Sequence, residues 1–131
     1  MKKIGVMNKG ISDVIAGMGH KDKIMICGSA FPIPENTRRI DLALEPGLPA
    51  FLDVLRVVLK ELKVEEIMIA KETLEKSPQH FEKMVAMFPG IEPTVIPQAE
   101  LKELSKQVKA CIRTGECTPF SNIILISGVT F

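Results

Sequence analysis

The sequence lacks the features of several large protein classes. No apolar run approaches the roughly 18 residues that a membrane-spanning helix requires, and the first residues lack the apolar run of a signal peptide. The 17 basic and 16 acidic residues nearly cancel, and no long run of one sign predicts a surface for nucleic acid. We therefore expect a cytoplasmic protein that binds neither membranes nor nucleic acids.

Cysteine and histidine are scarce. Cys27, Cys111 and Cys117 are odd in number and lack the CxxC spacing of metal sites, so we expect reduced thiols, with Cys27 in the core. Of the two histidines, His80 falls in the first turn of a predicted helix, where we expect it at the surface. We expect no metal site, and His20 remains as the candidate for proton transfer.

Motifs for nucleotide cofactors and for two common kinds of hydrolase are also missing. The sequence contains no GxGxxG that opens a helix, no P-loop, no HExxH and no GxSxG. We therefore expect a site without a cofactor, in which an imidazole moves protons on a small polar substrate.

The residues that are present predict one α/β domain over residues 1–131, because this length suits one domain and 46% hydrophobic content supports a core. Helical patterns alternate with short apolar runs, which predicts a mainly parallel sheet flanked by helices. The predicted helices contain residues 11–18, 51–62, 78–88 and 101–109, and the predicted strands contain 24–27, 64–70, 94–96 and 123–126. Residues 38–44 are predicted as a half-buried strand or extended segment, and residues 112–122 as a polar loop.

His20 lies between the first predicted helix and the first predicted strand. The loop that opens at Gly28 follows this strand, at the end where open α/β sheets usually bind ligands. One interpretation makes His20 part of such a site, and another leaves it as an imidazolium that complements the helix dipole. A nucleophilic pair of His20 with Cys27 or Cys117 is a third alternative.

A pattern of residues in three segments extends over the whole chain. It comprises Asn8, Ile11-Ser12 and Gly19-His20-x-Asp22, then Pro32-Ile33-Pro34 with Arg39-Ile40-Asp41-Leu42-Ala43-Leu44, and finally residues 112–125 with residues 128–131. In content and spacing, this pattern resembles the D-ribose pyranase family, which is related to the fucose mutarotases.

The resemblance implies an RbsD-like α/β subunit that assembles into a homodecamer of two stacked pentameric rings, with sugar sites between neighbouring subunits. It also implies an isomerase that interconverts the β-pyranose and furanose forms of ribose by general acid/base catalysis, without a metal or cofactor. The implied partners are a monosaccharide, such as ribose, and further copies of the chain.

The resemblance also implies roles for individual residues. His20 is the implied proton donor, and Asn122 the implied contact to a sugar hydroxyl. Further substrate-binding positions are Gly28, Gln98, Phe120 and Ser121, and additional pocket candidates are Asp22, Ser29, Lys71 and Glu72.

Several pocket positions depart from the pattern of the family. Gly28 replaces an aspartate, Gln98 a histidine and Phe120 a tyrosine. Gly28 offers no acceptor for a hydroxyl, and Gln98 can donate and accept hydrogen bonds but cannot titrate. Lys71 replaces an acidic residue, and a cation there would favour an acidic sugar. The alternatives are therefore a catalytically impaired, ring-forming sugar-binding homologue and a mutarotase for a different sugar, for example an acidic one.

Overall fold

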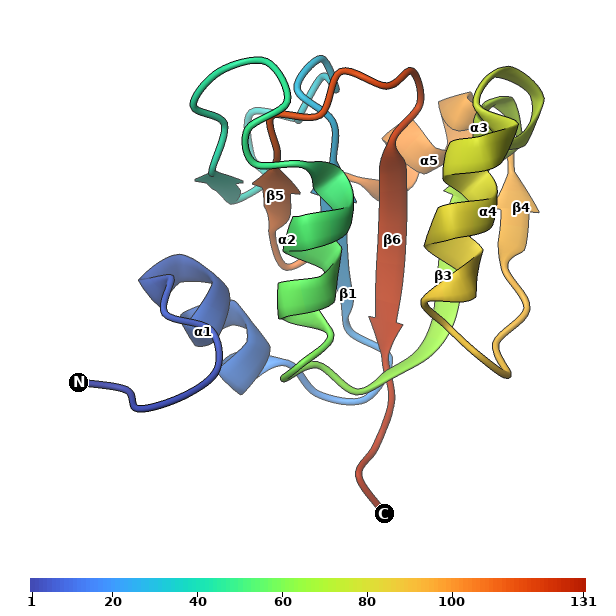
Figure 1. Cartoon of the computed structure of the whole chain (residues 1–131). Coiled ribbons are helices and arrows are strands. Elements are labelled where there is room, and N and C mark those ends of the chain that lie inside the picture. The colour runs from blue at the N-terminus through green and yellow to red at the C-terminus, as the bar shows by residue number, and fades with distance from the viewer.

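Six strands form one sheet in the computed structural model of the chain, which describes residues 1–131 (Figure 1). The strands are β1 (Lys23–Cys27), β2 (Arg39–Asp41), β3 (Val64–Ala70), β4 (Thr94–Ile96), β5 (Cys111–Arg113) and β6 (Asn122–Ser127). The helices are α1 (Lys9–Gly17), α2 (Phe51–Val58), α3 (Lys71–Lys76), α4 (Pro78–Ala86) and α5 (Gln98–Leu104). None of these helices is long and apolar enough to cross a membrane.

The strands lie across the sheet in the order β2-β5-β1-β6-β3-β4. β5 is parallel to both β1 and β2, and β3 is parallel to β4. β6 is antiparallel to its neighbours β1 and β3. Residues 114–121 contain no crossover helix, so the chain turns back directly into β6. The predicted α/β class with a mainly parallel sheet is confirmed, with β6 as the antiparallel exception.

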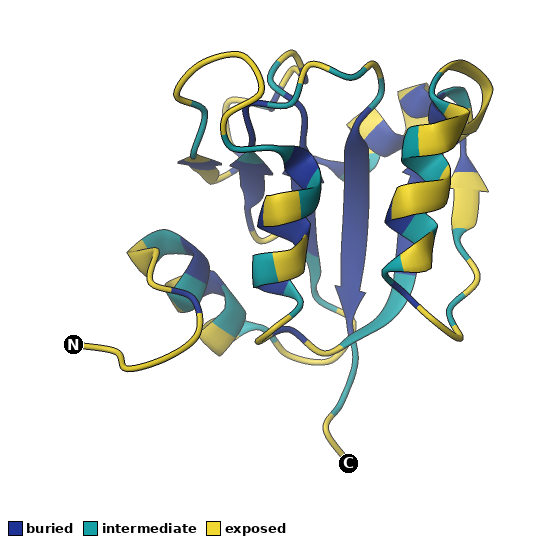
Figure 2. Ribbon diagram, in the orientation of Figure 1, coloured by how far each residue is buried: buried dark blue, intermediate teal, exposed yellow.

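The central strands are apolar along their length because both faces of the sheet are covered. All six residues of β6 are buried (Figure 2). Ile123 and Leu125 belong to the cluster that packs under α1, α2 and α4, whereas Ile124 and Ile126 belong to a second cluster with residues of α5. The sheet is therefore the middle of three layers (Figure 1).

Two short elements were not expected from the sequence. β5 lies inside the sheet, although a polar loop is predicted from residue 112, because three residues are too few to show a periodicity and the neighbouring strands impose the pairing. α3 continues directly from β3. Two predicted helices are also shorter than expected, since α2 ends at Val58 and α5 at Leu104, and turns follow both.

His80, which the sequence places at the surface, is half-buried. Its ring packs edge-on against the ring of Phe51, with centroids 5.4 Å apart, and its Nε2 is buried without a hydrogen-bond partner. Burial lowers the pKa of His80, partly opposed by the charge of Glu116. α4 thus turns this side chain toward the start of α2 rather than toward solvent.

Candidate functional site

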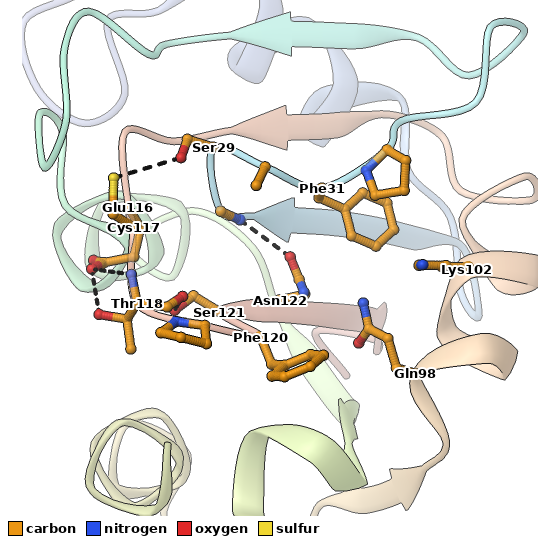
Figure 3. Close-up of a pocket in the computed structure, with 14 residues that line it drawn as sticks. Ser29, Phe31, Gln98, Lys102, Glu116, Cys117, Thr118, Phe120, Ser121 and Asn122 are labelled. Carbon is orange, nitrogen blue, oxygen red and sulfur yellow. Dashed lines mark hydrogen bonds between the residues drawn. The ribbon is translucent and has the colours of Figure 1, made fainter. Parts of the chain in front are cut away.

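A cavity of about 420 Å³ opens at the end of the sheet where β1 stops and β6 begins (Figure 3). The loop after β1, the loop before β6 and the start of α5 form its walls. The sequence-predicted residues that line it are Gly28, Ser29, Gln98, Phe120, Ser121 and Asn122. This is the carboxyl end of β1, where the sequence places a ligand site.

Asn122 forms the inner wall of the cavity. Its Oδ1 accepts a hydrogen bond of 3.2 Å from the backbone N–H of Gly28, which joins the end of β1 to the start of β6. Because Oδ1 is engaged, the Nδ2 group is what Asn122 can offer to a hydroxyl oxygen. A Cβ atom on Gly28 would lie 3.3 Å from the carbonyl oxygen of Glu116, so the backbone packs closely here.

Gln98 enters the cavity from the first residue of α5 (Figure 3). The residue is only 9% exposed, and its Oε1 has no hydrogen-bond partner in the chain. A buried acceptor without a partner is unfavourable unless a ligand donates to it. Because Oε1 is itself buried, the amide of Gln98 has to rotate toward the cavity before Oε1 can accept a hydrogen bond from a ligand such as an alcohol.

Side chains of neighbouring elements hold the loop before β6. The Thr73 hydroxyl donates to the carbonyl oxygen of Phe120 at 2.7 Å, and the Ser77 hydroxyl donates to that of Pro119 at 2.8 Å. Phe120 itself has a φ of 59°, in the left-handed region that residues other than glycine rarely adopt. These contacts hold the ring of Phe120 against the cavity.

Glu116 ties the same loop to α2. Its carboxylate accepts hydrogen bonds from the backbone N–H of Phe51 at 3.0 Å and from the Thr118 hydroxyl at 2.8 Å. Ala50 cannot cap α2 with its own side chain, so Glu116 supplies the missing acceptor. Burial alone would raise the pKa of Glu116, but these hydrogen bonds outweigh burial and hold the pKa below its usual value.

Sequence-based reasoning missed Lys102, which also lines the cavity. Lys102 follows Gln98 by one helical turn, so α5 presents both side chains on one face. Lys71 and Lys106 pair with carboxylates, whereas Lys102 takes part in no ion pair. The helical spacing after Gln98 is the signal that could have identified this cation.

His20 lies at the opposite end of the sheet from the cavity. It precedes β1, whereas Gly28 follows β1, and the five residues of this strand span roughly 15 Å. The Nε2 atom of His20 lies 3.0 Å from Oε1 of Glu65, and the side chain is 49% exposed. Within one chain, the structure does not bring His20 together with the cavity residues.

The remaining predicted residues lie outside the cavity lining. Asp22 shares the end of the sheet with His20, and its Oδ2 accepts a hydrogen bond of 2.8 Å from the N–H of Gly19. Lys71 is exposed and lies 3.5 Å from Glu75. Glu72 lies behind the cavity wall, where its Oε2 accepts a hydrogen bond of 2.8 Å from the N–H of Gln98.

The cysteines are free thiols in two environments. Cys27 is buried, as the sequence predicts, and its Sγ lies 3.5 Å from that of Cys111. This contact and burial raise the pKa of the Cys111 thiol, which disfavours a reactive thiolate. Cys117 is exposed and lines the cavity beside Ser29. No group of three or more His, Cys, Asp and Glu side chains is arranged to hold a metal ion.

The chain matches the model of the RbsD / FucU transport protein family over residues 1–130. It is 48% identical to the D-ribose pyranase of Symbiobacterium thermophilum over 131 residues, which are 100% of each chain. It is 52% identical to the D-ribose pyranase of Lactobacillus gasseri, again over 131 residues and 100% of each chain.

A solved structure, that of Bacillus subtilis RbsD complexed with D-ribose, has a TM-score of 0.97 to this chain. The two are 40% identical, and the match covers 100% of each chain. The resemblance inferred from the three sequence segments is confirmed by these matches. In sequence and in fold, the chain belongs to the RbsD/FucU family.

Proposed function

We propose that this protein is a D-ribose pyranase, a cytoplasmic isomerase that interconverts the β-pyranose and furanose forms of ribose without a metal or cofactor. The cavity beside Asn122 carries this proposal, because its volume of about 420 Å³ suits a small ligand and its walls offer both a donor and an unpartnered acceptor. The identity of 48% to a D-ribose pyranase supports it.

The reaction needs proton transfers and no redox step. Protonation of the ring oxygen and loss of the anomeric hydroxyl proton break the bond between C1 and the ring oxygen, which leaves an open-chain aldehyde. A different hydroxyl then attacks C1 and loses its proton, while the carbonyl oxygen gains one. We assign His20 to protonate the ring oxygen and to recover a proton from the attacking hydroxyl, with water exchanging the other proton.

In this proposal, His20 of one subunit serves the cavity of a neighbouring subunit. β1 separates His20 from Gly28 in a single chain, and both the His20 side chain and the cavity are open to a second copy. A head-to-tail contact that repeats around a ring joins two different surfaces of the subunit. We propose two stacked pentameric rings, as the sequence resemblance implies.

Within the cavity, the polar groups suit a sugar with several hydroxyls. The Nδ2 group of Asn122 donates to one hydroxyl oxygen, and Oε1 of Gln98 accepts from another. The ring of Phe120 covers an apolar face of the sugar. The hydroxyl of Ser29, which also lines the cavity, is our proposed substitute for the acceptor that Gly28 cannot provide.

Magnetisation-transfer NMR on ribose tests the proposal. The intact protein should accelerate exchange between the ribopyranose and ribofuranose signals above the rate in buffer. An unchanged rate with ribose, with other pentoses and with fucose would exclude the isomerase function and favour a binding homologue. Light scattering should give the mass of a decamer, and a monomeric mass would exclude a shared site.

Lys102 favours a second candidate, an acidic sugar such as a sugar phosphate or uronate. Its cation lines the cavity without a carboxylate partner, and both oxygens of Glu116 are engaged with protein groups. Magnetisation-transfer NMR between the α and β anomers of a pentose 5-phosphate, whose esterified O5 allows only furanose rings, should then show faster exchange than anomer exchange of ribose. Lys102→Gln should remove that preference, and Lys106→Gln, in the turn that follows α5, should not. A preference for ribose in the wild type would exclude this candidate.

A further inference from the structure

The parallel strands β3 and β4 end at the same level of the sheet, and the residues that follow them stay side by side. Ala70 pairs with Ile96 in parallel, and Glu72 and Gln98 each come two residues later. Because the offsets are equal, the two residues remain neighbours beyond the sheet. Oε2 of Glu72 accepts a hydrogen bond of 2.8 Å from the backbone N–H of Gln98.

This hydrogen bond supplies what the start of α5 lacks. The N-cap residue is Pro97, which has no side-chain acceptor, so the first N–H of the helix would otherwise have no partner. Gln98 is only 9% exposed, so solvent cannot readily replace Glu72. The negative charge of Glu72 also complements the positive end of the helix dipole.

The side chain of Gln98 depends on this arrangement. Its Oε1 is buried but has no hydrogen-bond partner in the chain, so no hydrogen bond to that atom fixes the direction of the amide. The position of the amide therefore follows from where the backbone of α5 begins. Lys102 lies one helical turn after Gln98 on α5, so its position also depends on where the backbone of α5 begins.

We propose that Glu72 is a positioning residue of the sugar site, which acts on the sugar only through Gln98. Glu72 is not part of the cavity lining, and its oxygen is directed at a backbone N–H. The proposal rests on the proposed function of the cavity, because it assigns Gln98 to a bound sugar. It predicts that the effect of removing Glu72 disappears once Gln98 has been removed.

Hydrogen exchange of the Gln98 amide tests the contact without reference to any sugar. Glu72→Ala should speed this exchange about fivefold, the typical effect of losing a helix cap. Glu72→Gln keeps a side-chain carbonyl and should stay close to the wild type. Glu75→Ala is the matched control, because Glu75 lies on the same helix and contacts only Lys71 at the surface. An unchanged Gln98 exchange rate in Glu72→Ala would overturn the contact.

A double-mutant cycle on ribose binding, measured by NMR titration, tests the role. Glu72→Ala and Gln98→Ala should each weaken binding about fivefold, and the double variant should be within about twofold of Gln98→Ala alone. A double variant about 25-fold weaker than the wild type would mean independent effects and would overturn the positioning role.

Two further outcomes are distinguishable. If Glu72→Ala does not fold, Glu72→Asp replaces it. The aspartate side chain is one methylene shorter, which moves the carboxylate away from the N–H of Gln98. Glu72→Asp is then combined with Gln98→Ala in the same double-mutant cycle and judged by the same criteria. If the wild type binds and isomerises no sugar, the proposed function fails, and the exchange rate of the Gln98 amide still decides whether Glu72 anchors α5.

Discussion

The two ends of the sheet carry different kinds of side chain. At the end before β1, His20 and Lys21 are exposed and contact the carboxylate of Glu65, and the hydrogen bond from Lys21 lowers the pKa of Glu65. At the end after β1, Asn122 is 4% exposed and bonds to the backbone N–H of Gly28. One end is charged and open to solvent, and the other is a shaped cavity with a hydrogen-bonded wall.

Under the proposed function, neither end by itself is a complete active site. The cavity has donors and acceptors, but its carboxylate, Glu116, is engaged by Phe51 and Thr118 and is not free to move protons. His20 is about half exposed, but it does not line this cavity in its own chain. Contact between the two ends of different copies would combine a titratable group with a binding site.

Removal of the imidazole should have the largest effect. His20→Ala should slow ribose exchange by about 10²–10⁴-fold, the usual contribution of one general acid/base, with little change in ribose affinity. His20→Gln keeps a hydrogen-bonding group toward Glu65 but cannot titrate, so it should be equally slow. An active His20→Gln variant would show that His20 positions the sugar and does not transfer a proton.

Substitution of Asn122 should have the second largest effect, because it removes a sugar contact in the cavity and leaves His20 in place. Asn122→Ala leaves the N–H of Gly28 without its acceptor and should weaken ribose binding by about 5–100-fold in an NMR titration. Asn122→Asp keeps an oxygen for Gly28 but loses the Nδ2 donor, so it should restore stability and not affinity. Asn36→Ala, at an exposed loop residue, is the control and should match the wild type.

Substitution of Glu116 should have a smaller effect, and it should lower the stability of the fold more than the rate of ribose exchange. Glu116→Gln keeps one side-chain oxygen as acceptor for two donors, the N–H of Phe51 and the hydroxyl of Thr118. The variant should therefore lose about 1–2 kcal/mol of stability, which lowers the Tm by several degrees. Glu103→Gln, an exposed residue paired with Lys106, should leave the Tm unchanged. An equal loss in both variants would contradict the role of Glu116 at the start of α2.

His80 should have the smallest effect, visible only as a pH dependence. Because burial lowers the pKa of His80 below its unfolded value of 6.5, the unfolded chain takes up the proton first. His80 therefore contributes stability above pH 6.5 that is lost as the pH falls below this value. Tm measured between pH 7.5 and pH 5 should fall more steeply in the wild type than in His80→Leu, and equal slopes would contradict this assignment.

The sequence was sufficient for the elements with long apolar patterns. The stripe of α2, with Phe51, Leu55 and Val58, and the apolar run of β6 both appear as helical or strand patterns, and both are buried on the sheet. β5 was missed because its three residues become a strand only through pairing with β1 and β2. The edge-on packing of His80 on Phe51 likewise depends on a contact between helices that are far apart in sequence.

The candidate site was predictable only in part. The loop after Gly28 and the start of β6 follow from strand boundaries, since the ligand end of a sheet can be inferred from the direction of its strands. Lys102 and the anchoring contact of Glu72 needed the orientation of α5, which local patterns do not specify. The separation of His20 from the cavity could have been predicted from the strand over residues 24–27, because His20 precedes this strand and Gly28 follows it.

A complementation experiment tests the central claim that two copies build each site. His20→Ala, impaired in exchange rate, and Asn122→Ala, impaired in ribose binding, are mixed at equal concentration, dissociated and allowed to reassemble. Ribose exchange is then measured by NMR at a ribose concentration too low to saturate Asn122→Ala. If the site combines His20 of one subunit with Asn122 of another, random assembly should restore about a quarter of the wild-type sites. Activity of the mixture that stays at the level of the separate variants would contradict the shared site.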